Sequence, residues 1–501
     1  MRQIYSSLFQ GAALAAALTA FGAAPSFAQN GGKFGGTLNV VWGDPRSGSA
    51  GGDVRFSIAL DGGKTYPLLV APVDQGKAIT SFGKHVVIDG RLTKDAHGNP
   101  AIQAQRIGAP PAAPPSHHAT ETRRVLYILL KYQGDSQEPH SEQFYLDLTN
   151  PKKGDLGKNI PASINGFFDK TSWHNLQWKA DVTDWMKLPH PKTYYANCGW
   201  DQSCANLGAL SNDAFALAVK AGVNLSVYDN INFVINNDLD CCAWGGGTSY
   251  QGKSYGATWE PPWGQETSVY SHEFGHSIGL PHSGWTYYAY DSPWDIMSKR
   301  TAAKTIQCGS YFSVNDGADR AINCTEPGDG YIAPHKDYLG WLPAENQVVI
   351  DAPRTKEIKL EANALPLRKG IKLVKICLAG LPCTGGSAHY LSVEARIGGK
   401  KYENGLTGDG VIIQDVYLNR GAIGGSCYFN SQSGFAVPID ATPGDWDAEN
   451  CDSGGREWPD YALGNAQFLP GQTYRNNSLH VSVQVKKQEG SSYIVKVKRT
   501  N

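Results

Sequence analysis

The chain has 501 residues, a length that suggests about three domains and leaves ample sequence to bury a core. Its formal net charge of −1 argues against nucleic acid or an acidic surface as a partner, because both attract a clear excess of positive charge. The 57 glycines and the aromatic share of 11% favour a rigid, turn-rich extracellular protein.

Residues 1–28 have the pattern of a secretory signal peptide. Arg2 supplies the charged start, residues 11–24 are apolar, and Ser26-Phe27-Ala28 is a small-residue cleavage site. A membrane anchor is the alternative, but the apolar run is short and no stop-transfer charges follow it. No later stretch approaches the length that spans a bilayer. We therefore expect a secreted protein without a membrane span.

Residues 29–107 are predicted to form a small β domain, either a barrel or a sandwich. Val54, Phe56 and Ile58 alternate with less apolar residues, which is the period of a half-buried strand. Turns are expected after Leu60, in Asp-Gly-Gly, and at Asp89-Gly90. This region is interpreted as a propeptide or an accessory module.

A proline-rich linker, residues 108–118, is the clearest domain boundary. Residues 119–345 then alternate between strand and helix patterns. Val125–Tyr132 is an apolar run typical of a strand that is buried on both faces. Ser211 or Asn212 is expected to cap a helix that ends at Gly222. This order predicts a mixed α/β sheet with crossover helices.

Residues 346–501 change to a β pattern. Alternating valines at 481, 483 and 485 are followed by a turn and a second alternating run, which indicates a hairpin. Nothing in this region has a catalytic pattern.

The stretch His272–Ser283, HEFGHSIGLPHS, carries the clearest chemistry. His272 and His276 are four residues apart, so on a helix they lie on one face and can hold two corners of a zinc tetrahedron. Gly279 allows the helix to end, and the turn can bring His282 back as a third ligand. Three ligands with one open position are typical of catalytic zinc. Glu273 is placed to act on water at that position.

This segment resembles the HExxHxxGxxH signature of the metzincin zinc endopeptidases. That family has a methionine turn beneath the metal, and DSPWDIMS supplies Met297, one of only three methionines. Lys299 occupies the position where some members place a tyrosine ligand, so no fifth protein ligand is expected. The surrounding sequence, including HKDYLGWLP, is most similar to the gametolysin and immune inhibitor A branches.

The resemblance implies a multidomain architecture. An α/β metzincin-like zinc peptidase domain, with a mixed twisted sheet and an active-site helix, is flanked by the small β domain and by a C-terminal β-sandwich-like domain. Family members bind substrate as an added strand at a sheet edge, and residues 253–260 are the candidate edge. An ordinary glycine-rich loop is the alternative for that segment.

The ten cysteines all lie between Cys198 and Cys451, six before the boundary near residue 346 and four after it. The even counts in an exported chain predict disulfides that stay within domains. Cys241 and Cys242 are expected to bridge to different partners. Asn315–Asp319 and the carboxylates of residues 444–452 are candidate Ca²⁺ sites, with solvated loops as the alternative.

The sequence thus predicts a secreted zinc metalloendopeptidase that acts on protein or peptide substrates. Zn²⁺ held by His272, His276 and His282 would lower the pKa of a bound water towards about 7, and Glu273 would act as general base. Met297 and Gly279 would support the metal site. Two rivals stay open, an adhesin or glycan-binding protein with a peptidase core and a hydrolase of non-peptide acyl bonds.

Whether the enzyme is made in an inactive form depends on what occupies the open coordination position of the zinc. Many metzincins are held inactive by a propeptide cysteine, but this chain has no cysteine before Cys198. If residues 29–107 restrain an enzyme, they must do so sterically or through an oxygen or nitrogen ligand such as Asp or His. The alternative is a β domain that stays attached to an active enzyme.

Overall fold

The structure is a computed structural model. It describes residues 31–46, 53–96, 98–108, 120–151, 160–284, 290, 292–421, 434–442 and 463–501. The expected signal peptide and nearly all of the expected linker lie outside these residues. None of the described helices has the length and apolarity that crossing a membrane requires.

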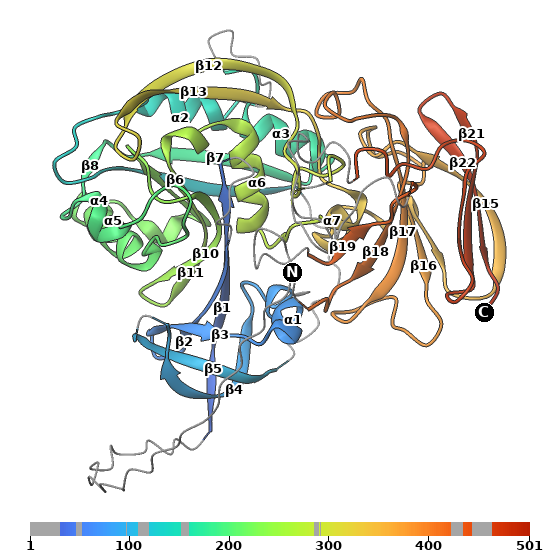
Figure 1. Ribbon diagram of the computed structural model, residues 1–501, viewed down its shortest axis with the longest axis horizontal. Coiled ribbons are helices and arrows are strands. Elements are labelled where there is room, and N and C mark those ends of the chain that lie inside the picture. The colour runs from blue at the N-terminus through green and yellow to red at the C-terminus, as the bar shows by residue number, and fades with distance from the viewer. Residues whose placement is uncertain are drawn as a thin grey trace, which may run out of the picture.

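The N-terminal region is a closed five-stranded barrel (Figure 1). Its strands are β1 (Gly32–Pro45), β2 (Asp53–Leu60), β3 (Thr65–Leu69), β4 (His85–Lys94) and β5 (Pro100–Ile107). They pair in the order β1–β2–β3–β5–β4 and back to β1. The short helices η1 (Pro72–Asp74) and α1 (Gln75–Ile79) lie between β3 and β4.

One turn expected in the barrel is wrong. Asp89 and Gly90 lie inside β4, where the register with β5 shifts by one residue. Gly90 is required there because a Cβ at this position would lie 2.6 Å from the carbonyl oxygen of Gln103. The Asp-Gly pair therefore marks a β-bulge rather than a chain reversal.

The central region is a mixed sheet that continues from the barrel through β1. Its order is β1-β10-β11-β9-β6-β7, and β8 also pairs with β6. The strands added to β1 are β6 (Glu121–Lys131), β7 (Leu176–Val182), β8 (Met186–Lys187), β9 (Asn230–Ile235), β10 (Cys242–Tyr250) and β11 (Lys253–Glu260). Strand β10 is antiparallel to both neighbours, whereas β11, β9, β6 and β7 run parallel.

Helices cover both faces of this sheet. One face carries α2 (Glu142–Thr149), α3 (Ile164–Thr171) and α6 (Thr267–Ser277), and the other carries α4 (Lys192–Tyr195) and α5 (Leu207–Lys220). The remaining short helices are η2 (Leu225–Val227), η3 (Pro262–Gly264), α7 (Ala333–Tyr338) and η4 (Ala344–Asn346). Strand β6 is buried on both faces, as its apolar run predicts, because its alternate side chains enter the two helix-covered cores.

Helix α5 begins earlier than the sequence suggests. Asn206 caps it by accepting a hydrogen bond from the Ala209 amide at 3.0 Å, whereas Ser211 lies inside the helix and donates to the carbonyl of Leu207. Gly222 follows the helix with a positive φ of 84°, as expected.

The C-terminal region consists of two sheets packed around one core. One sheet has the order β14-β16-β17-β18-β19 and the other β15-β22-β21-β20. The first contains β14 (Gln347–Ile350), β16 (Leu373–Cys377), β17 (His389–Arg396), β18 (Gly410–Tyr417) and β19 (Ala436–Pro438). The second contains β15 (Arg354–Glu361), β20 (Thr473–Asn476), β21 (Val481–Glu489) and β22 (Ser492–Arg499). The β21–β22 pair is the hairpin predicted from the alternating valines.

A long hairpin of β12 (Ala302–Ser313) and β13 (Ala318–Pro327) arches over α6 (Figure 1). Asn315–Asp319, one of the candidate calcium segments, covers the end of its turn and the first two residues of β13. Asp316 pairs there with Arg320 at 2.7 Å, and Gly317 takes a positive φ of 65°. These contacts explain the segment as a hairpin turn. The second candidate, residues 444–452, lies outside the described residues.

Four disulfides join described cysteines, Cys198–Cys204, Cys241–Cys242, Cys308–Cys324 and Cys377–Cys383. None of these four crosses the boundary near residue 346, as predicted. The expectation that Cys241 and Cys242 bridge to different partners is wrong, because they bond to each other. Cys427 and Cys451 lie outside the described residues.

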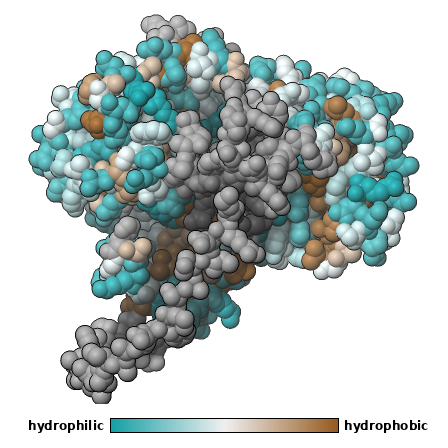
Figure 2. Space-filling view, in the orientation of Figure 1, coloured by the Kyte–Doolittle hydropathy of each residue, from teal (hydrophilic) through white to brown (hydrophobic). Residues whose placement is uncertain are grey.

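Hydrophilic residues cover most of the visible face of the central and C-terminal regions, and hydrophobic residues are visible where the barrel meets the rest of the chain (Figure 2).

Candidate metal centre

Helix α6 places the HEFGH segment inside the protein. Glu266 caps its start by accepting hydrogen bonds from the amides of Ser268 and Val269 at 2.9 and 2.8 Å. Its end follows from Gly279, whose φ of 98° is available to glycine at little cost. The chain then reverses, and the Leu280 amide donates to the carbonyl of Gly275 at 2.9 Å. This turn brings residue 282 back towards the helix.

The three predicted histidine ligands lie together. The Nε2 atoms of His272 and His276 are 3.1 Å apart, and the ring centroid of His282 lies within 5.4 Å of both other rings. The Nδ1 atom of His272 contacts the carbonyl of Ile296 at 2.5 Å, and that of His276 contacts the carbonyl of Leu280 at 2.7 Å. An Nδ1–H that donates to a carbonyl leaves the Nε2 lone pair free for a metal.

Asp44, near the end of β1, is a fourth member that sequence reasoning did not single out. Its Oδ1 lies 2.8 Å from Nε2 of His282, and its Oδ2 lies 3.3 and 3.2 Å from Nε2 of His272 and His276. Four ligands placed about 2.0–2.1 Å from one zinc ion at tetrahedral angles stand roughly 3.3 Å from each other. One ligand atom from each of Asp44, His272, His276 and His282 lies within 4.8 Å of the other three, so the four residues are close enough to surround a single small cation.

One unpartnered atom supports this fit. Oδ2 of Asp44 is buried and has no hydrogen-bonding partner among the described residues. A buried carboxylate oxygen without a donor is costly unless a cation completes its surroundings. Three imidazoles and one carboxylate are also ligand types that zinc accepts. The residues present therefore fit a zinc ion.

Burial and mutual contact set the charges in this group. Burial lowers the pKa of His276 to about 3 and lowers the pKa of His272 as well, so both imidazoles are neutral at pH 7. Burial alone would raise the pKa of Asp44, but the facing imidazoles of His272 and His282 bring it well below its ordinary value. A buried carboxylate that faces three imidazoles is a donor set that favours a cation.

Glu273, the predicted general base, is fully buried behind the histidines. Its two carboxylate oxygens have no hydrogen-bonding partner among the described residues. Burial, reinforced by the carboxylates of Asp44 and Glu260, raises the pKa of Glu273 well above its ordinary value. Gly245 of β10 passes so close that a Cβ there would lie 2.7 Å from Oε2 of Glu273.

Met297 lies directly under α6, where the sequence places it. A Cβ at Gly275 would stand 2.4 Å from Sδ of Met297, so the turn and the helix touch at this glycine. The buried carboxylate of Asp295 holds the turn by accepting from Ser283 Oγ at 2.5 Å and from the Met297 amide at 3.3 Å. It also pairs with Nδ1 of His335 at 2.9 Å.

Two aromatic residues complete the surroundings of the histidines. Trp42 of β1 stacks on His276, with ring centroids 4.5 Å apart and planes 11° apart. The hydroxyl of Tyr290 donates to Oδ1 of Asp44, and its ring contacts His282 at 4.9 Å. Tyr290 belongs to the aromatic segment that follows the third histidine, and no local sequence signal distinguishes it from its neighbours.

The sheet edge differs from the prediction. Residues 253–260 form β11, which lies between β9 and β10 and is therefore an interior strand. The strand nearest to the histidines is β10. One of its edges pairs with β11 and the other with residues 41–45 of β1.

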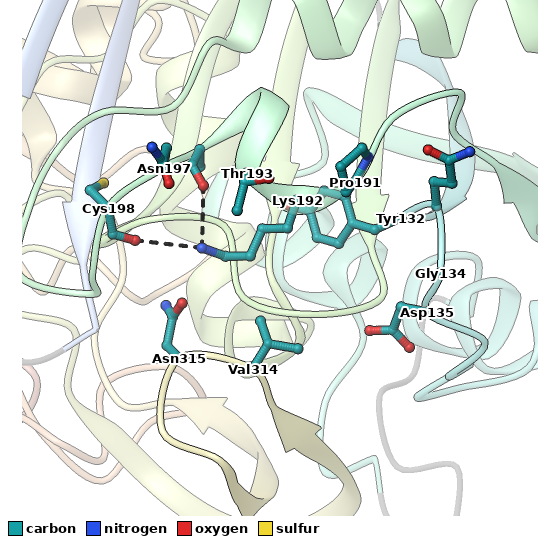
Figure 3. Close-up of a pocket in the computed structure, with 12 residues that line it drawn as sticks. Tyr132, Gly134, Asp135, Pro191, Lys192, Thr193, Asn197, Cys198, Val314 and Asn315 are labelled. Carbon is teal, nitrogen blue, oxygen red and sulfur yellow. Dashed lines mark hydrogen bonds between the residues drawn. The ribbon is translucent and has the colours of Figure 1, made fainter.

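A separate surface recess lies away from the histidines (Figure 3). It has a volume of about 510 Å³ and contains none of the metal-binding residues. Lys192 reaches across it to the carbonyls of Ala196 and Cys198 at 3.4 and 3.5 Å. These contacts satisfy the lysine within its own loop.

No protein-family model matches the chain, and no curated protein is significantly similar to it.

Proposed function

We propose that this chain is a secreted zinc-dependent endopeptidase with a metzincin-like catalytic domain. The observation that supports this most strongly is the convergence of His272, His276 and His282 beside the buried carboxylate of Glu273. The four disulfides are compatible with an extracellular protein.

The three histidines would hold the zinc through Nε2. Backbone carbonyls fix the orientation of two of these rings, His272 and His276. When bound, zinc would polarise the scissile carbonyl and lower the pKa of a coordinated water. Glu273 would accept the proton of the attacking water and pass it to the leaving amine. Burial and the neighbouring carboxylates of Asp44 and Glu260 raise its pKa, which suits a group that must both accept and donate a proton.

The edge of β10 would orient the substrate. Its glycines at 245–247 keep the strand free of side chains where it passes the helix, so an extended peptide could approach closely. Backbone hydrogen bonds along such an edge bind many sequences, as an endopeptidase requires. The turn at Met297 would keep the floor of the site rigid.

The test compares Glu273→Gln with the parent in a chain that starts at Thr120 and therefore lacks the barrel. We expect the variant to retain about one equivalent of zinc and to lose about 10²–10⁴-fold in casein hydrolysis, because the ligands remain and the base is lost. Glu345→Gln, at an exposed carboxylate, is the matched control and should change neither quantity.

Substantial casein hydrolysis by Glu273→Gln would contradict the mechanism. Hydrolysis of acetyl esters without any cleavage of casein would instead indicate a non-peptide acyl hydrolase.

A further inference from the structure

The proposed catalytic group is closed off from solvent. Asp44 and His272 are each 1% exposed, and His276, His282 and Glu273 are 0% exposed. A protein substrate must bring an extended segment within contact of these side chains. In this conformation the group is therefore inaccessible, and a segment of the chain must move before a substrate can bind.

The segment that occupies the site is the end of β1. Residues 32–43 of β1 pair with β4 and β2 inside the barrel, and residues 41–45 pair antiparallel with β10, so that residues 41–43 are shared by the two parts. Gly43 lies opposite Trp244, and Asp44 lies opposite Ala243. These residues use the same backbone donors and acceptors of β10 that an added substrate strand would need.

The contact is closely fitted. A Cβ at Gly43 would lie 2.6 Å from the Trp244 ring, and a Cβ at Gly246 would lie 2.1 Å from the carbonyl oxygen of Val40. Glycine at both positions thus lets the two strands approach. Trp42, fully buried, covers the open side of His276. A barrel that merely accompanied the enzyme would not need to fill the site in this way.

We propose that Asp44 is the fourth metal ligand and that residues 41–45 of β1 hold the peptidase in a latent form. This proposal rests on the peptidase function proposed above. The carboxylate would occupy the coordination position that water needs, and the strand would occupy the substrate edge. No covalent bond is made or broken, because withdrawal of β1 would exchange the carboxylate for water as the fourth ligand. It also explains how a chain without a cysteine in its first 197 residues can block a zinc site.

The charges agree with this assignment. The three imidazoles carry no carboxylate partner other than Asp44 among the described residues within hydrogen-bonding distance of their Nε2 atoms. The Tyr290 hydroxyl, which donates to Oδ1, orients the carboxylate towards the histidines. Withdrawal of β1 would remove Asp44 and Trp42 together, and would free the position beside Glu273.

The first experiment uses cobalt spectroscopy and needs no activity. The full chain, Asp44→Ala and Asp61→Ala are loaded with Co²⁺, and their visible absorption is recorded with and without azide. Asp61 is the matched control because it is also a barrel aspartate paired with a histidine, His85, at 2.9 Å, but it is exposed. We expect only Asp44→Ala to change the spectrum and to respond to azide.

Identical spectra for the full chain and Asp44→Ala, with the same azide response, would overturn the assignment of Asp44 as a ligand. This outcome does not depend on whether the protein cleaves peptides, so it separates the proposal from the proposed function.

The second experiment measures casein hydrolysis by full-length variants. Gly43→Val should push β1 away from Trp244 and raise hydrolysis by about tenfold or more over the parent chain. Asp44→Ala should give a smaller rise, because the strand still covers the edge. Gly62→Val is the control, since a Cβ at that turn meets no atom within 4 Å.

A parent chain as active as Gly43→Val would overturn latency. Spectra that respond as expected without hydrolysis by any variant would uphold Asp44 as a ligand and refute the peptidase function.

Discussion

The barrel and the C-terminal sandwich are both β structures that flank the central sheet, yet they contact it by different kinds of interaction. The barrel is joined chiefly through β1, which adds to the edge of β10, and also through Arg55 of β2. The sandwich is joined through buried hydrogen bonds. An added strand can be exchanged for another strand, because its bonds are made to backbone groups that any extended peptide provides.

The sandwich contact centres on Arg396 of β17, which is 0% exposed. Its guanidinium pairs with Glu403 at 2.7 Å and donates to the backbone carbonyls of Trp294 and Gly330. The Trp294 side chain in turn donates to the carbonyl of Leu463 at 2.7 Å. Trp294 precedes the turn that carries Met297, so the sandwich directly supports the floor of the metal site.

A second buried group strengthens this contact. Glu394 of β17 accepts from the Ala333 amide at 3.0 Å and from the Asn363 side chain at 2.7 Å. Lys336 of α7 donates to Asn363 at 2.6 Å. Buried hydrogen bonds to charged groups are costly to break, because a charged or polar group would be left buried without its partner. The comparison therefore indicates a permanent support on one side of the site and a removable strand on the other.

The largest expected effect is at the permanent contact. Arg396→Leu should lower the free energy of unfolding by about 3–5 kcal/mol, because Glu403 would remain buried without its cation. The loss of the hydrogen bond to Trp294 should also loosen the turn at Met297. Urea denaturation and zinc content are the two measurements.

The double variant Arg396→Leu with Glu403→Leu serves as the control for this prediction. It should recover much of the lost stability, since no unpaired charge is left. Unfolding of Arg396→Leu at the same urea concentration as the parent would show that the sandwich is attached no more firmly than the barrel.

An intermediate effect is expected where the metal-binding helix meets its support. Gly275→Ala should destabilise the protein by about 1–3 kcal/mol, because the new methyl would overlap Sδ of Met297. Combining it with Met297→Ala should relieve part of this cost. Thermal unfolding of the two single variants and the double variant measures the coupling, and strictly additive effects would contradict contact between the two positions.

The local part of the metal site was predictable from the sequence because its members are neighbours in the chain. His272, His276 and Glu273 share one helix, and Gly279 and the following turn fix the position of His282. Asp44 was not predictable, since it lies 238 residues before His282 and reaches it only through the β1–β10 pairing. Six aspartates occur in residues 29–107, and no local pattern distinguishes this one.

In the fold, too, local features were predictable from the sequence and long-range pairings were not. Strand β6 and the β21–β22 hairpin follow from apolar periodicity, which is local. The position of β11 inside the sheet depends on which strand pairs with its other edge, and two strands with similar composition cannot be ordered from periodicity alone. The bond between Cys241 and Cys242 does not follow from cysteine spacing, because the number of cysteines in a region does not determine which of them meet.

The smallest expected effect is at the removable contact. Arg55 of β2 donates to the carbonyl of Ala205 at 2.6 Å and to Ser203 Oγ at 2.9 Å, and its guanidinium lies 4.2 Å from the centroid of the Trp244 ring. Arg55→Ala should weaken the docking of the barrel by about 1–2 kcal/mol, because the arginine side chain is itself 32% exposed and water weakens its contacts.

The way in which the barrel is attached decides which measurement detects this weaker docking. If the barrel is a separately docked unit, Arg55→Ala should speed hydrogen exchange at the amides of β10 by about 5–30-fold and leave the urea midpoint of the whole chain unchanged. Arg91→Ala, at an exposed barrel position, should alter neither quantity. A fall in the global midpoint comparable with that of Arg396→Leu would mean that the barrel is as integral as the sandwich. Withdrawal of β1 would then require global unfolding, and a latent enzyme that opens by releasing one strand would be excluded.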